Sequence, residues 1–123
     1  MKPGMWPNCA LYIVSAMVLL LFTGGVAGAT TQSSDLVNAR DRGDGPALDV
    51  LIQYARENAE ANPNSAEAQY QLALAYSYGA EVAMEQHDKK KSESLAEAGL
   101  EVAKKTVSEA SSNAEYHRLL GAL

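Results

Sequence analysis

Apolar residues recur every three or four positions from about residue 35 to the end of the chain. This spacing places them on one face of an α-helix, and no run of alternating β-branched residues predicts a strand. Polar, glycine- or proline-containing segments interrupt the pattern at residues 43–46, 61–65, 87–91 and 111–113. The pattern therefore predicts an all-α fold of antiparallel helices joined by short loops.

The first expected helices are short. A polar linker over residues 30–34 precedes a weak helix over 35–42, which ends where glycine and proline break the chain. Asp44 or Gly45 can cap the next helix, and Pro46 is suited to its first turn. That helix, up to residue 61, carries an apolar stripe interrupted by one polar residue: Ala47, Val50, Leu51, Tyr54, Asn58 and Ala61.

The later helices are predicted to be longer. Ser65 is placed to cap a helix that runs to about Gln86, with one face formed by Ala68, Leu72, Ala75, Tyr76, Gly79 and Ala83. Residues 87–91 are expected to form a charged turn, with the lysines at 89–91 in an exposed loop. A further helix from about residue 92 to 109 has a wide apolar face, which requires neighbours on two sides. Another helix starts at Ala114.

The N-terminal segment has the three-part order of a secretory signal. Lys2 precedes an apolar stretch over residues 10–22, and Ala27 and Ala29 form an A-x-A site. We expect a signal peptide over residues 1–29, cleaved after Ala29, and an exported chain that is periplasmic or secreted. The alternative is an uncleaved membrane anchor, because the apolar character extends over about 20 residues, enough to span a bilayer. Cys9 precedes the apolar run, which disfavours a lipoprotein.

Charge and cysteine content narrow the function. After Ala29 there are nine Lys and Arg and fifteen Asp and Glu, a net charge of −6. No basic stripe is available to neutralise phosphates, which argues against a nucleic-acid partner. The segment after Ala29 has no cysteine, so it can form neither a disulfide nor a thiolate metal site. Residues 30–44 are predicted to form a linker and partial first helix, and 45–123 a helical domain.

Two helix starts repeat one another. Residues 64–68, Asn-Ser-Ala-Glu-Ala, are echoed by residues 112–116, Ser-Asn-Ala-Glu-Tyr. From Pro63 to Tyr76 the chain resembles the first helix of the tetratricopeptide repeat (TPR) family: Leu72, Ala73 and Tyr76 match its large, small and aromatic positions, while Gln69 stands where the family usually has Trp. Gly99 and Thr106 meet the family's small positions seven apart, and Ser111 replaces its closing proline.

The resemblance covers about residues 36–123, as one whole repeat between two partial ones. Gly43 and Asp44 resemble the turn between the two helices of a repeat. The distance from Ala66 to Ala114 is 48 residues, whereas the family repeat is about 34. The extra residues fall between Tyr76 and Gly99 and predict a longer hairpin of the same kind. A TPR-like α-solenoid is thus expected, with a generic helical bundle as the alternative.

No motif indicates catalysis, and we expect neither an enzyme nor a cofactor. G-x-S-x-G and phosphate-loop patterns are absent from the sequence. A metal site from Glu81, Glu85, His87 and Asp88 is conceivable, but a solvated helix end explains these residues better. His117 lies thirty residues from His87, outside any metal-binding spacing.

The resemblance implies a binding role, in which the first helices of the repeats line a concave surface that holds a protein or peptide. On this sequence the lining positions are Glu67, Tyr70, Leu74, Ser77, Tyr78, Glu81, Glu115 and Arg118. Tyr70 and Leu74 could equally pack against the preceding repeat. Residues of their type disfavour the carboxylate clamp of chaperone-binding members. The alternative is a membrane-anchored structural subunit of an envelope complex.

Repeat proteins generally need about three stacked units and polar ends. This sequence has one whole repeat, and Leu119, Leu120 and Leu123 lie close to its last residue. We therefore expect a longer repeat array, or a stack that a partner or a second copy of the chain completes.

Overall fold

Five helices follow one another in the part of the chain that the structure describes. The computed structural model describes the backbone of residues 27–123 and the side chains from Gln32 onward. The helices are α2 (Ala27–Asp41), α3 (Gly45–Ala61), α4 (Ala66–Glu85), α5 (Lys89–Glu109) and α6 (Ala114–Ala122). No strand occurs among these residues, so the expected all-α class is confirmed for them.

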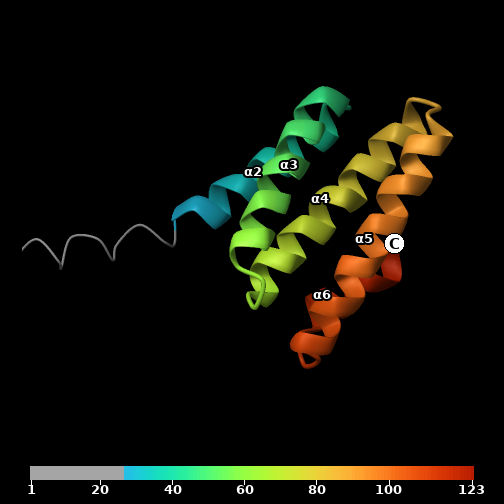
Figure 1. Cartoon of the computed structure of the whole chain (residues 1–123). Helices are drawn as coiled ribbons and strands as arrows, with labels where there is room; N and C mark the ends of the chain where they lie inside the picture. Colours follow the sequence, from blue (N-terminus) through green and yellow to red (C-terminus); the bar gives the residue numbers. More distant parts are fainter. Residues whose placement is uncertain (1–26) are drawn as a thin grey trace, which may run out of the picture. The chain divides into compact units, whose positions relative to one another are not determined.

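Helix α4 is the centre of the compact unit formed by residues 32–123. It lies between α3 and α5, and Figure 1 shows these three helices side by side in chain order. Helix α6 returns along the hairpin of α4 and α5 and contacts both. Because α4 has neighbours on several sides, its buried residues, from Ala68 to Ala83, surround most of the helix.

The turns within the two hairpins have the same geometry. Gly43 ends α2 with a φ of 62°, and His87 ends α4 with the same φ. In both turns the next residue, Asp44 or Asp88, donates its backbone N–H across the helix end, to Ala39 and Ala83 respectively, at 2.9 Å. Each aspartate then caps the following helix by accepting a backbone N–H three residues later.

The connections between hairpins also repeat. Asn62 ends α3 with φ −129° and ψ 63°, and Ala110 ends α5 with φ −139° and ψ 62°. Three residues later, Ser65 and Asn113 cap α4 and α6 in nearly identical extended conformations. The chain from residue 32 to residue 123 is therefore a helical hairpin, a second helical hairpin of the same construction, and one further helix.

Two groups of buried residues hold the helices together. The larger joins α2, α3 and α4 through residues such as Leu36, Leu48, Ile52, Leu72 and Val82. The smaller joins α4, α5 and α6 and consists of Ala73, Leu74, Ala103 and Leu119. Alanines in both groups let the helices approach closely, as the alanine-rich composition requires.

Two details differ from the sequence prediction. Helix α5 begins at Lys89, so the lysines at 89–91 form its first turn and are not in a loop, because Asp88 supplies the cap. The expected linker at residues 30–34 lies within α2, which begins at Ala27.

The buried face of α3 is not the predicted stripe. Leu48, Ile52, Ala55 and Ala59 are buried, whereas Val50 and Tyr54 are 55% and 61% exposed. The helix carries apolar residues on two sides, and Val50 and Tyr54 lie on the outward one.

The predicted signal segment falls almost wholly on residues 1–26, which lie outside the described residues. The expected cleavage point after Ala29 falls in the first turn of α2. Among the described helices, none has the length and apolar character needed to cross a membrane.

Candidate functional site

The candidate site is the side of α4 that continues onto α6. Its best-defined feature is a pair of aromatic rings: Tyr70 of α4 stacks on Tyr116 of α6 with 4.9 Å between ring centroids and 28° between planes. Such a pair adds about 0.5–1.5 kcal/mol beyond the buried area. The two tyrosines therefore attach α6 to α4 and define the centre of this surface.

Polar contacts surround the ring pair. The Tyr70 hydroxyl donates to Glu115 Oε1 at 3.0 Å, and Arg118 Nε donates to both carboxylate oxygens of Glu115. The guanidinium, followed by the Tyr70 hydroxyl, lowers the pKa of Glu115 to about 2. Burial, followed by the hydrogen bond to Glu115, raises the pKa of Tyr70 to about 12. Glu115 is thus ionised and Tyr70 neutral at ordinary pH.

A second set of contacts extends across three helices. Glu67 accepts hydrogen bonds from Gln71 Nε2 at 2.7 Å and from the Tyr116 hydroxyl at 3.3 Å. Ser33 of α2 donates to Gln71 Oε1 at 3.1 Å. Burial, followed by the charge of Glu67, raises the pKa of Tyr116. The network therefore joins α2, α4 and α6 through one glutamate and one glutamine.

Leu74 and Tyr78 also make contacts within the chain. Leu74 is buried, 7% exposed, in the group that joins α4 to α5 and α6. Tyr78 is half-buried, and the Arg40 guanidinium lies over its ring at 4.6 Å from the centroid. Arg40 also pairs with Asp41 at 2.8 Å. The cation–π contact links α2 to α4 on the same side as the network.

Ser77 and Glu81 differ from the other predicted residues because their side chains make no polar contact with another described helix. Ser77 is half-buried and Glu81 exposed, and neither side chain has a hydrogen bond or ion pair within the described residues beyond α4. The structure thus brings Glu67, Tyr70, Glu115 and Arg118 together, uses Leu74 and Tyr78 in packing, and leaves the surface around Ser77 and Glu81 accessible.

The sequence did not reveal three residues of this surface. Gln71 follows Glu67 by four positions, a helical spacing that indicates a side-chain pair. Ser33 and Arg40 lie on α2, in a segment interpreted as linker and weak helix, and nothing in their local sequence indicates a contact with α4.

The surface is formed by polar, charged and aromatic side chains. No group of three or more His, Cys, Asp or Glu side chains lies together among the described residues. In particular, Asp88 of the conceivable metal set caps α5, and His87 holds the turn before it.

Comparison of the chain with protein-family models, with curated proteins and with solved structures found no match.

Proposed function

We propose that this protein is a TPR-like interaction scaffold that binds a peptide segment of a protein partner along the side formed by α2, α4 and α6. The observation that carries the proposal is the repetition of the hairpin. Turns of the same kind at Gly43 and His87, and nearly identical connections before Ser65 and Asn113, are what a stack of helical repeats requires.

The packing order supports the same proposal. Helix α4 contacts α3 before it, α5 after it and α6 beyond that, so each hairpin is followed by the first helix of the next. Leu72, Ala73 and Tyr76 are all buried, as the resemblance to the family implies. Gln69, in the place of the usual Trp, is also buried, and its amide donates to the Ala59 carbonyl at 3.2 Å.

Stacked hairpins display their first helices as parallel rows of side chains on a rigid backbone. Such a surface suits an extended or helical peptide, whose side chains meet successive rows. In this chain the accessible positions of the α4 row are the half-buried Ser77 and the exposed Glu81. A partner with donor or basic groups complements this set, because Glu81 is exposed and forms no ion pair among the described residues.

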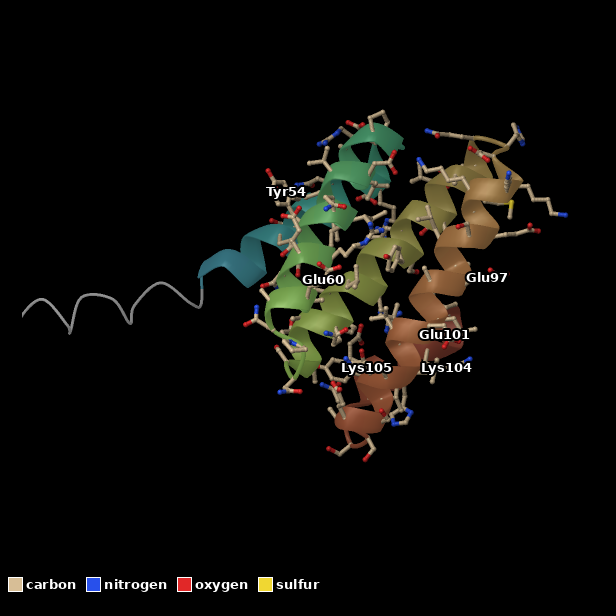
Figure 2. The ribbon with its side chains drawn as sticks, in the orientation of Figure 1. Tyr54, Glu60, Glu97, Glu101, Lys104 and Lys105 are labelled. Atoms are coloured by element: carbon tan, nitrogen blue, oxygen red, sulfur yellow. The ribbon has the colours of Figure 1, made fainter. Side chains whose placement is uncertain are left out.

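Site-specific photo-crosslinking tests the binding surface. A photoreactive amino acid replaces Glu81 in one variant and Glu97 in a control. Glu97 is also exposed, but Figure 2 shows it on the outward side of α5. We expect a discrete protein adduct from position 81 in the source cells and none from position 97. A second probe replaces Ser77. Equal adducts from positions 81 and 97 would contradict the proposal, and so would the absence of an adduct from both position 81 and position 77.

We further propose that the scaffold is exported, with residues 1–29 as a cleaved signal. The support is the order of Lys2, the apolar stretch and the A-x-A site. Mass spectrometry of the accumulated protein is expected to find Thr30 as the first residue. Recovery of Met1 or Lys2 from a membrane fraction would favour the alternative, a membrane-anchored structural subunit.

A further inference from the structure

The outward side of the first hairpin is an apolar helix face beside a groove. The groove, with a volume of ≈ 360 Å³, lies between α2 and α3 and has Ala39, Ala47, Val50 and Leu51 among its lining residues. Tyr54 continues this stripe one turn along α3, and Figure 2 shows it on the side of α3 away from α4. Large apolar side chains gathered on one exposed face indicate an interaction surface.

The repeat shows what covers a surface of this kind. Residues 44 positions apart occupy equivalent places in the two hairpins, as Gly43 and His87 do. In the second hairpin the equivalent surface is covered by the first: a Cβ on Gly79 would lie 2.9 Å from Ile52 Cδ1, and Gln86 Nε2 donates to the Gly43 carbonyl at 2.9 Å. The cover is an apolar helix face, that of α3.

The groove of the first hairpin occupies the place of that covered surface. Asp35, Asn38 and Arg42, which line it, are the equivalents of Gly79, Val82 and Gln86. Their polarity distinguishes the groove from the permanent contact between the hairpins, in which Val82 is 1% exposed. The polar residues of this groove therefore suit a reversible protein–protein interface better than permanent packing against another hairpin.

The order of the polar residues is self-complementary. Asp35, Asn38 and Arg42 lie on one face of α2 at positions i, i+3 and i+7, over about 10 Å of helix. When two such helices lie antiparallel about a two-fold axis near Asn38, Asp35 of each copy faces Arg42 of the other. Among the described residues, neither side chain has an ion pair of its own.

We propose that two copies of this chain associate through the first hairpin, about a two-fold axis, with Val50 and Tyr54 of each copy in the α2–α3 groove of the other. A two-fold interface uses the same patch on both copies. It thus covers both apolar stripes at once and pairs Asp35 with Arg42 at both ends. The interface lies on the outer face of α2 and α3, so the association is independent of the binding surface around Glu81.

Sedimentation equilibrium of the purified chain, in the form that cells accumulate, tests the association. We expect the mass to rise with concentration to twice that of the chain. Val50→Asp should raise the dissociation constant by about tenfold or more, because it places a charge in a desolvated contact. Met84→Asp is the matched control, since Met84 is 53% exposed against 55% for Val50 and lies outside the groove. We expect it to leave the dissociation constant unchanged.

A charge exchange tests the two-fold geometry itself. Asp35→Arg alone places two guanidinium groups together at each end and should weaken association. Arg42→Asp added to it restores an opposite pair and should recover most of the lost affinity. Circular dichroism identifies any variant that fails to fold, and Val50→Ser then replaces Val50→Asp.

Three results would overturn the proposal. The first is a chain that stays monomeric at every concentration. The second is a dimer that Val50→Asp leaves intact or that Met84→Asp disrupts equally. The third is a double variant, Asp35→Arg with Arg42→Asp, that associates no better than the single one.

Discussion

Replacement of Gly99 by alanine probes the contact on which the second hairpin depends. A Cβ on Gly99 would lie 3.0 Å from Tyr76 Cβ and 3.1 Å from Leu123 Cδ2. The Leu123 contact is with a methyl group at the end of a side chain, which can move by bond rotation. The Cβ of Tyr76 is fixed to the backbone of α4, so only a separation of α4 from α5 relieves that contact.

Gly79 of α4, three positions after Tyr76, provides a matched comparison. A Cβ there would lie 2.9 Å from Ile52 Cδ1 and 3.1 Å from Leu95 Cδ1. Both contacts are with methyl groups at the ends of side chains, which move by bond rotation without displacing a helix. The contacts at Gly79 are therefore cheaper to relieve than the Tyr76 contact at Gly99, although the distances are nearly the same.

The magnitudes follow from two opposing effects. Alanine is favoured over glycine in a helix interior by about 1 kcal/mol, and overpacking a core costs about 1–3 kcal/mol. For Gly79→Ala the two should nearly cancel. For Gly99→Ala we expect a net loss of about 1–2 kcal/mol, because the upper part of that range applies when helices must separate. For a unit of this size, each 1 kcal/mol corresponds to about 4–8 °C in Tm.

Urea denaturation followed by circular dichroism measures both variants. Gly121→Ala isolates the helix preference, since nothing lies within 4 Å of a Cβ there, and it should stabilise slightly or have no effect. If Gly99→Ala is as stable as Gly79→Ala, the backbone-fixed contact with Tyr76 does not limit the approach of α4 and α5, and the reasoning fails.

Three further predictions concern turns and ionisation. His87→Gly should stabilise the fold by about 1 kcal/mol and Gly43→Ala destabilise it by a similar amount in urea denaturation, because both positions have a φ of 62°. Tyr70→Phe should remove the part of the tyrosinate absorbance titration that lies near pH 12, because the pKa of Tyr70 is raised from 10.0 to about 12. The stability that the protonated Tyr70 hydroxyl contributes is therefore complete below pH 10 and is lost as pH rises through 12. Arg118→Met should return the pKa of Glu115 from about 2 toward 4.5 in a carboxyl ¹³C NMR titration, and an unchanged pKa in this variant would rule out the guanidinium as the cause. In the unmodified chain, the stabilisation by ionised Glu115 is present above pH 4.5 and should be lost as pH falls toward 2.

Periodicity predicted the helices well but chose the wrong face of α3. The predicted stripe contains the large residues Val50, Leu51 and Tyr54, so it dominates the pattern, but of these only Leu51 packs against the core. The buried face is marked by Leu48 and Ile52 followed by alanines, and alanine carries little apolar weight in a sequence. Which side of α3 is buried depends on where α4 packs, and the sequence of α3 alone does not contain that information.

The candidate site shows a similar division. The resemblance selected residues of α4 and α6 that lie on one side, and Glu67, Tyr70, Glu115 and Arg118 do come together. It did not indicate that they bind one another, because the contact between Tyr70 and Glu115 joins residues 45 positions apart. Nor could it place Leu74 in the core, since a leucine on a helix surface and one beneath the next helix occupy the same position in the pattern.

The repeat itself was only half visible in the sequence, for a geometric reason. Helix α3 has 17 residues and α5 has 21, so the turns within the hairpins recur after 44 residues and the connections between hairpins after 48. No single period aligns both. Four added residues amount to about one helical turn, which leaves the faces of the longer helix within about 40° of their former direction. A hairpin can therefore gain a turn without changing what it packs against. The same insertion removes the constant spacing by which a repeat is recognised, so the matching turns at Gly43 and His87 are the better marker of the repeat.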